Sequence, residues 1–380
     1  MTYFAVADRI EASSGRLGEG AMKRRILKAV AQFNEYGLPL GGKWTDRVLS
    51  AYCQPHRHFH TLQHLLEICD GVREHHADDP RMASDLMLTA LFHDVVWYPQ
   101  RRDNEERSVQ AFRIVMNSIG NPLPPDAMER VSNAILATHA QENPTPLAGF
   151  FNELDCNIII HGSTVDLLAY EYQIFREYQY LNVAEYRKGR SAFFRRFARR
   201  FPECRNNMRT LVEFLERRRP RVGIYAGTFN PFHIGHLSIL EKAEMMFDKV
   251  IVAVGINPEK HAAGNLATPQ LKAILPFHEV IAFDTLMVDL VEQESELSDV
   301  TLVRGLRNGY DLDYEMNQLC FMQGMRPSIQ AVYIPCDKNL EHISSSALKG
   351  LALFELRGRD SIYYPHKYDY FNRSLEELFG

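Results

Sequence analysis

The 380-residue chain lacks the features that mark several classes of protein. Its six cysteines are scattered without a Cys-x-x-Cys pair, so neither a disulfide framework nor a cysteine zinc site is indicated. The formal net charge of -5 singles out no class of partner, and we expect neither nucleic acid nor a membrane to be bound. The first twenty residues hold no apolar run typical of a signal peptide or a membrane span. A cytoplasmic protein is therefore expected.

The length of the chain suggests two domains, each large enough to bury its own core. Residues 1–21 are expected to be disordered. Pro220 follows three arginines and predicts a boundary, because proline disfavours helix at the residue before it. We expect a helical domain over residues 22–218 and an α/β domain over residues 219–380.

Before this boundary, residues 187–221 are rich in arginine, with phenylalanines at helical spacing. Such a basic face with interleaved aromatic rings can bind nucleic acid or an acidic membrane surface. We favour the alternative, in which this is the last helix of the first domain, with its rings packed inward and its arginines solvated.

Histidines and aspartates of the first half suggest a metal site. His60 and His64 are four residues apart, so we expect them on one face of a helix. A second helical pattern ends in the pair His93 and Asp94, and Asp155 lies further along the chain. A divalent metal that activates water needs a few such ligands from different helices. The alternative is a helical bundle whose histidines only satisfy buried hydrogen bonds.

The order His, His-Asp, Asp on a helical chain resembles the HD phosphohydrolase superfamily. The Arg-x-x-His-x-x-x-His opening at Arg57 and the tyrosine-rich stretch 170–180 are similar to predicted metal-dependent HD phosphohydrolases. Cyclic nucleotide phosphodiesterases share this opening and use its first histidine as the proton donor, which implies that role for His60. The resemblance implies a divalent transition metal held by His64, His93, Asp94 and Asp155. A catalytically dead docking module remains the rival interpretation of this half.

The second half alternates between strand and helix patterns. The β-branched and aromatic runs lie at 222–226, 249–255, 280–283, 300–303 and 329–334. This alternation predicts a Rossmann-like α/β domain with a parallel, doubly wound sheet of five strands. The sequence has no Gly-x-Gly-x-x-Gly or Walker motif, so neither a dinucleotide-binding domain nor a P-loop ATPase is supported.

The first of these strands leads into the sequence Gly-Thr-Phe-Asn-Pro-Phe-His-Ile-Gly-His at 227–236. Gly227 permits a tight turn, and Gly235 leaves room for a close ligand. His233 and His236 lie about one turn apart at the start of the next helix, where α/β folds bind phosphates. A strand-turn-helix with a capping histidine is the simpler alternative.

Two later segments carry groups suited to phosphate at the ends of strands. Arg304 and Arg307 can meet phosphate oxygens through planar forks, and the serines at 344–346 offer hydroxyls and backbone N–H groups.

The His-x-Gly-His sequence resembles the signature of the nucleotidylyltransferases. Together with the arginine and serine segments it resembles the bacterial phosphopantetheine adenylyltransferases, which make dephospho-coenzyme A and pyrophosphate from ATP and 4'-phosphopantetheine. This resemblance implies that His236 stabilises the transition state, that Mg²⁺ accompanies ATP, and that the protein is a homo-oligomer. It places around ATP the residues Thr228, Phe229, His233, His236, Gly305, Leu306, Arg307, Glu315, Leu340, Ile343, Ser344, Ser345 and Ser346. It places around the acceptor the residues Thr228, Lys260, Leu286, Met287 and Arg304. The alternative acceptor is nicotinate or nicotinamide mononucleotide, whose adenylyltransferases more typically carry a histidine at the position of His233.

Overall fold

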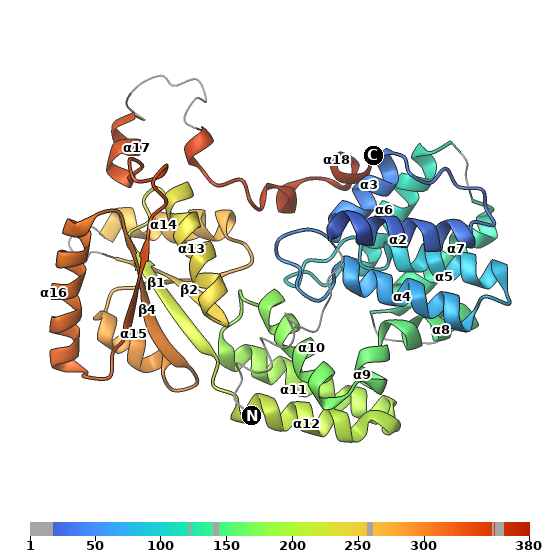
Figure 1. The fold of residues 1–380 in the computed structure, drawn as a ribbon, viewed down its shortest axis with the longest axis horizontal. Coiled ribbons are helices and arrows are strands. Elements are labelled where there is room, and N and C mark those ends of the chain that lie inside the picture. The colour runs from blue at the N-terminus through green and yellow to red at the C-terminus, as the bar shows by residue number, and fades with distance from the viewer. Residues whose placement is uncertain (1–17, 121–122, 140–143, 257–260, 352, 354–360) are drawn as a thin grey trace. The chain divides into compact units, whose positions relative to one another are not determined.

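The computed structural model describes residues 18–120, 123–139, 144–256, 261–351, 353 and 361–380 (Figure 1). The chain forms two compact units that are interleaved in sequence. The helical unit contains the described residues up to Glu177 together with Phe194–Leu211 and Tyr370–Gly380, and the sheet unit contains Tyr178–Phe193 and Val212–Asp369. The sequence predicts instead a single boundary near residue 219. No helix among the described residues combines the length and apolar content needed to cross a membrane.

The helical unit begins with α2 (Glu19–Gln32), so part of the segment expected to be disordered is helical, and the rest lies outside the described residues. Its further helices are α3 (Lys43–Ala51), α4 (Leu62–His75), α5 (Pro80–Phe92), α6 (Asn104–Ser118), α7 (Pro125–Ala137), α8 (Pro146–Asp155), α9 (Asn157–His161) and α10 (Thr164–Glu177). Helices α11 (Val183–Arg200) and α12 (Arg205–Arg217), separated by the 3-10 turn η1 (Pro202–Cys204), each contribute residues to both units.

Helix α5 is the centre of the helical unit. Asp79 accepts a hydrogen bond from the N–H of Met82 and Pro80 occupies the first turn, which together fix where the helix begins. Every residue from Ala83 to Phe92 is buried, as expected for a helix surrounded by others. Helices α4, α6, α7 and α8 pack against it. The end of α5 therefore delivers the next residues, His93 and Asp94, into the interior of the unit.

The start of α4 corrects one prediction. The side chain of Thr61 accepts a hydrogen bond from the N–H of Gln63 and caps the helix, which begins at Leu62. His60 therefore precedes the helix that carries His64, and the expectation that the two share a helix face is wrong. Their rings are nevertheless close, with centroids 6.0 Å apart.

The helical unit also contains the C-terminal segment of the chain. The 3-10 turn η4 (Asp369–Asn372) leads to α18 (Leu375–Phe379), which packs against α3 and α6. Ser374 and Glu377 form a reciprocal capping box at the start of α18. Leu375 and Phe379 are buried, so this end of the chain is part of the core of the unit.

The sheet unit has a five-stranded parallel sheet, as expected from the alternating sequence pattern. The strands are β1 (Arg221–Gly227), β2 (Lys249–Gly255), β3 (Glu279–Phe283), β4 (Asp299–Leu306) and β5 (Ala331–Pro335), in the order β3-β2-β1-β4-β5 (Figure 1). The connecting and flanking elements are α13 (Ile234–Met246), α14 (His261–Ile274), α15 (Met287–Glu294), α16 (Gly309–Met325), α17 (Ser345–Leu351) and the 3-10 turn η3 (Ser361–Tyr363).

The strand order determines where a ligand can bind. The chain winds from β1 to β2 and β3 on one side, and then returns to β4 and β5 on the other. Strands β1 and β4 are adjacent and parallel, with Tyr225 opposite Val303. Open α/β sheets bind ligands outside the carboxyl ends of their strands at such a switch point. The ends of β1 and β4 are therefore the expected binding site of the sheet unit.

Candidate active sites

A cavity of about 440 Å³ lies at the carboxyl ends of β1 and β4 in the sheet unit. The loop after β1 forms one wall, and the residues that end β4 and begin α16 form another. The serine segment before and within α17 completes the lining, and the Ser345 hydroxyl donates to the carbonyl oxygen of Pro231 at 2.9 Å. Three segments that are far apart in sequence thus border a single cavity.

The glycines of the loop after β1 allow its close packing. A Cβ atom at Gly227 would lie 3.0 Å from the ring of Phe229, and one at Gly235 would lie 3.1 Å from the ring of His233. Phe229 itself has a φ angle of 45°, a left-handed conformation that is uncommon for residues other than glycine. We expected Gly235 to leave room for a ligand, but in the structure the ring of His233 lies against it.

His233 and His236 form a stacked pair at the start of α13. Their ring centroids are 3.7 Å apart, and the backbone N–H of His233 donates to Nδ1 of His236 at 3.3 Å. Since this bond makes Nδ1 an acceptor, the proton of a neutral His236 is on Nε2. Burial lowers the pKa of His236 to about 3, assisted by the neighbouring His233 and Arg307. His236 is therefore a neutral hydrogen-bond donor that borders the cavity.

His233 is neutral for similar reasons. Burial, with a smaller effect of the Arg307 guanidinium, lowers its pKa to about 4. Its Nδ1 is buried and has no hydrogen-bond partner within the described part of the chain. This nitrogen faces Gly235 of the same loop, while His233 as a residue borders the cavity.

Both arginines of the fourth-strand segment are oriented by carboxylates. Arg304 donates from Nη1 to the carbonyl oxygen of Ala226 at 3.0 Å, and its Nε lies 3.2 Å from Glu315. Arg307 meets Asp311 through two bonds of 3.0 and 3.2 Å. These pairs fix the two guanidinium groups at the cavity before any ligand binds.

Most of the residues expected around the nucleotide and the acceptor border this cavity. They are Thr228, Phe229, His233, His236, Arg304, Gly305, Arg307, Glu315, Ile343, Ser344, Ser345 and Ser346. Four expected residues do not border it, namely Leu286, Met287, Leu306 and Leu340. Lys260 lies outside the described residues.

Sequence reasoning gave no role to the lining residues Tyr225, Ile239, Asp311, Tyr314 and Cys336. Asp311 could have been found from the sequence, because it follows Arg307 by four residues, the spacing of an ion pair on a helix surface.

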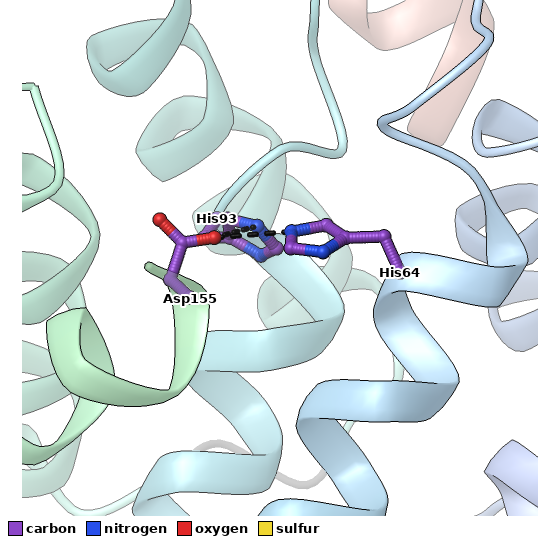
Figure 2. Close-up of side chains that lie close together, drawn as sticks. All are labelled: His64, His93 and Asp155. Atoms are coloured by element: carbon purple, nitrogen blue, oxygen red, sulfur yellow. Dashed lines mark hydrogen bonds and ion pairs between the residues drawn. The ribbon is translucent and has the colours of Figure 1, made fainter. Parts of the chain in front are cut away.

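In the helical unit, three helix ends bring His64, His93 and Asp155 together (Figure 2). One nitrogen or oxygen atom from each of these residues lies within 4.8 Å of the other two. Asp155 Oδ1 is 3.0 Å from His64 Nε2 and 3.6 Å from His93 Nε2. The fourth expected ligand, Asp94, places Oδ2 at 3.0 Å from His93 Nε2. The structure thus groups three of the four residues that the sequence suggested, and the fourth, Asp94, contacts this group through His93.

The atoms of this cluster fit a divalent cation. His93 Nδ1 lies 2.9 Å from the carbonyl oxygen of Ala90, which can only accept, so Nδ1 carries a proton and Nε2 is the nitrogen that faces the carboxylates. That Nε2 atom is buried, 3.0 Å from Asp94 Oδ2 and 3.6 Å from Asp155 Oδ1. Two imidazole nitrogens and two carboxylates form a donor set common for transition metals.

The electrostatics of the cluster favour a positive charge. Burial alone would lower the pKa of His93, but the carboxylates of Asp94 and Asp155 outweigh it and raise this pKa to about 9. Conversely, the nearby histidines hold the pKa of Asp94 well below its usual range despite its burial. The two carboxylates therefore stabilise a positive charge at this point, whether a proton on His93 or a bound cation.

His60 is oriented by Glu177, a residue that sequence reasoning missed. Glu177 Oε2 is 2.6 Å from His60 Nδ1, and Oε1 accepts hydrogen bonds from the backbone N–H groups of His58, Phe59 and His60 at 2.8 to 3.0 Å. Burial opposes a charge on His60, but Glu177 and Asp94 outweigh it and raise the pKa of His60. His60 Nε2 points to the cluster, 3.9 Å from Asp94 Oδ2. The His60–Glu177 pair therefore holds a proton beside the candidate metal site.

A second cavity, of about 480 Å³, lies beside His64 in the helical unit. Its lining residues are His58, Phe59, Thr61, Gln63, His64, Glu67, Asn157, Ile158, His161, Gly162, Asp166, Ala169, Tyr170 and Gln173. They combine aromatic rings with amide side chains, and they include no lysine or arginine.

The parallel sheet, the cavity at its switch point and the paired histidines define a nucleotidyltransferase of the cytidylyltransferase-like family, whose profile matches residues 224–351. Phosphopantetheine adenylyltransferase of Bartonella quintana is 36% identical over 143 residues, which cover 35% of this chain and 81% of that protein. The enzyme of the same name from Brucella ovis is 37% identical over 144 residues, and that from Wolbachia pipientis is 32% identical over 138 residues. These alignments cover 34% and 35% of this chain and 84% and 80% of the two relatives. The chain therefore belongs to the phosphopantetheine adenylyltransferase family.

These relatives account for about a third of the chain. The likeness concerns its C-terminal region, and the HD resemblance of the helical unit depends on that unit's own residues.

Proposed function

We propose that the sheet unit transfers AMP from ATP to 4'-phosphopantetheine, giving dephospho-coenzyme A and pyrophosphate. The observation that carries this proposal is the neutral His236, whose Nε2 proton is available in a cavity that also contains Arg304 and Arg307. The membership of the chain in the phosphopantetheine adenylyltransferase family supports the choice of acceptor.

In the proposed reaction, a phosphate oxygen of the acceptor attacks the α-phosphorus of ATP, and pyrophosphate leaves. ATP enters as its magnesium complex. Such an in-line transfer depends on positioning and on neutralising the developing charge, so it needs no covalent nucleophile. His236 donates a hydrogen bond to the oxygens that gain charge in the transition state. Arg304 holds the acceptor phosphate, and Arg307 holds the triphosphate.

Pyrophosphate release tests this proposal. The full-length protein is incubated with ATP, Mg²⁺ and, in separate reactions, 4'-phosphopantetheine, nicotinate mononucleotide and nicotinamide mononucleotide. We expect rapid release with 4'-phosphopantetheine only. Release with a mononucleotide but not with 4'-phosphopantetheine would still support adenylyl transfer, and it would identify that mononucleotide as the acceptor. An absence of release with every acceptor would contradict the proposal.

We further propose that the helical unit is a metal-dependent phosphohydrolase. His64, His93, Asp94 and Asp155 would hold a divalent transition metal, which supplies an activated water and a Lewis acid for phosphate when it is bound. His60, oriented by Glu177, would protonate the leaving group. The convergence of one ligand atom each from His64, His93 and Asp155, all within 4.8 Å of one another, is the observation that favours a metal site over a purely structural cluster.

The cavity beside His64 limits the substrate of this unit. The described residues that line it include no lysine or arginine, whereas Glu67 and Asp166 contribute carboxylates, so the cavity is poorly suited to a second phosphate group. Gln63, Asn157 and Gln173 can both donate and accept hydrogen bonds, and Phe59 and Tyr170 supply ring surfaces. We therefore expect a phosphate ester with a single phosphate group and a polar remainder that carries no further negative charge.

Metal analysis and ester hydrolysis together test the hydrolase. The purified protein should contain or take up a stoichiometric divalent transition metal, and should hydrolyse p-nitrophenyl phosphate or bis(p-nitrophenyl) phosphate when loaded with it. A protein that takes up no metal would support the docking-module interpretation instead.

A further inference from the structure

Tyr370, in the C-terminal segment, begins a chain of hydrogen bonds within the helical unit. Its hydroxyl oxygen lies 2.7 Å from His56 Nδ1, and His56 Nε2 lies 2.7 Å from the carbonyl oxygen of Trp97. A carbonyl oxygen can only accept, so the proton of the neutral imidazole is on Nε2. Nδ1 must then accept, and Tyr370 donates. Burial lowers the pKa of His56 to about 3, in agreement with a neutral ring.

The chain continues from Trp97 to the candidate catalytic residues. The indole Nε1 of Trp97 donates to Glu177 Oε2 at 2.9 Å, the same oxygen that lies 2.6 Å from His60 Nδ1. The rings of Trp97 and His60 are also close, with centroids 3.9 Å apart. Trp97 is therefore held at its backbone by His56, while its side chain fixes both the carboxylate and the imidazole of the Glu177–His60 pair.

The surrounding contacts show that Tyr370 is built into the unit. Its ring stacks on that of His56, with centroids 5.7 Å apart, and the ring of the next residue, Phe371, meets Tyr98 edge to face at 5.0 Å. The following helix α18 is packed against α3 and α6. Arg57 donates to the carbonyl oxygens of Asp94 and Val95, which fixes the other end of the segment that carries Trp97. The segment between Asp94 and Tyr98 is therefore restrained from both sides.

We propose that the C-terminal segment 370–380 completes the site of the helical unit, and that Tyr370 is a positioning residue that acts on His60 through His56 and Trp97. The consequence for catalysis depends on the proposed hydrolase function, whereas the coupling from Tyr370 to Trp97 depends only on the geometry. The site of the helical unit thus uses residues that follow the whole transferase in sequence. A protein that ended at residue 211 would therefore lack part of this site.

The substitution Tyr370→Phe tests the coupling in the full-length protein, because it removes only the hydroxyl group that donates to His56. The chain has two tryptophans, Trp44 and Trp97, so a ¹⁵N spectrum contains two indole N–H signals, which Trp44→Phe assigns. Trp44 donates to the carbonyl oxygen of Pro39 and serves as the internal reference. Tyr364→Phe makes the same chemical change in the sheet unit and is the matched control.

We expect Tyr370→Phe to shift the Trp97 signal and leave the Trp44 signal in place, while Tyr364→Phe shifts neither. With manganese and p-nitrophenyl phosphate or its bis ester, whichever the parent hydrolyses, kcat should fall about three- to tenfold with little change in KM, the effect expected for the loss of one buried hydrogen bond. Adenylyl transfer should be unchanged.

Unchanged indole signals in Tyr370→Phe would overturn the proposal, and so would equal shifts of both signals, which indicate a general structural change. If the parent hydrolyses neither ester but the Trp97 signal alone shifts, the hydrolase proposal fails and the coupling stands. If the parent is active and the Trp97 signal shifts without a change in kcat, the coupling is present but Tyr370 is not a positioning residue.

Discussion

His233 and His236 are stacked at the start of α13, with the backbone N–H of the first residue donating to Nδ1 of the second. This single bond determines which nitrogen of His236 carries a proton, and so makes Nε2 a donor beside the cavity. The simpler interpretation of the His-x-x-His spacing, a capped helix, is also correct. The cap is the means by which the loop orients the proposed catalytic group.

The first prediction concerns His236→Ala. This change removes a donor directed at charge that appears mainly in the transition state, so turnover should fall by roughly a hundred- to thousandfold, or about 2.7 to 4 kcal/mol. ATP binding, measured by calorimetry, should change much less. The exposed His75 provides the control, and His75→Ala should transfer AMP at the parent rate. Normal turnover of His236→Ala would show that the assigned role is wrong.

The second prediction concerns the two arginines of the cavity. Arg304→Lys and Arg307→Lys keep the charge but lose the planar fork, so each should bind its phosphate group poorly. Calorimetry should show weaker acceptor binding for Arg304→Lys and weaker ATP binding for Arg307→Lys.

The carboxylate partners separate orientation from charge. Asp311→Asn keeps Arg307 intact but weakens the ion pair that holds it, so ATP binding should fall less than in Arg307→Lys. Unaltered binding of both ligands in the two lysine variants would count against the placement of ATP and acceptor in this cavity.

The third prediction concerns pH. Because the pKa values of His236 and His233 are about 3 and 4, both rings stay neutral down to about pH 5, and their protonation should leave no inflection in the rate of adenylyl transfer between pH 6 and 8. An inflection near pH 6.5 that disappears in His236→Ala would contradict this.

The same pKa values affect stability in a defined direction. In the unfolded chain these histidines take up protons below about pH 6.5, whereas in the folded protein they do so only near pH 3 to 4. The contribution of these histidines to the free energy of unfolding should therefore be complete above pH 6.5. It should decrease as the pH falls from there towards 4. Urea titrations of the parent and of His236→Ala at pH 7.5 and 5 measure this, and the variant should lose less stability.

The fourth prediction concerns the proposed metal site. Asp94→Ala removes a carboxylate 3.0 Å from His93 Nε2, so it should reduce metal content and abolish phosphohydrolase activity. Elemental analysis measures the metal, and Asp78→Ala, at an exposed position, is the control. Adenylyl transfer should stay within a few fold of the parent, because its cavity belongs to the other unit. Loss of transfer in Asp94→Ala would mean that the two activities are coupled.

The sequence predicted the sheet unit well because its signals are local. Each of the five strands is a short apolar run, and His233 and His236 are placed by a turn and a helix start within ten residues of β1. The candidate metal cluster was proposed from residue types in a recognisable order, although the distances between these residues depend on the packing of α4, α5 and α8.

Residues whose role depends on distant partners could not be predicted. Glu177 is 117 residues from His60 in sequence, and Tyr370 is 314 residues from His56. Neither pair has a spacing signal, because tertiary packing alone brings them together. The assignment of His60 to a helix failed for a local reason, since Thr61 caps α4 one residue after it.

The most direct test of the central claim is a competition between acceptors. The full-length protein receives ATP, Mg²⁺ and equal concentrations of 4'-phosphopantetheine and nicotinate mononucleotide, and the products are identified by mass. The account predicts dephospho-coenzyme A as the dominant early product, formed in step with pyrophosphate and lost in His236→Ala. A dominant dinucleotide product, or pyrophosphate release that His236→Ala leaves unchanged, would contradict it.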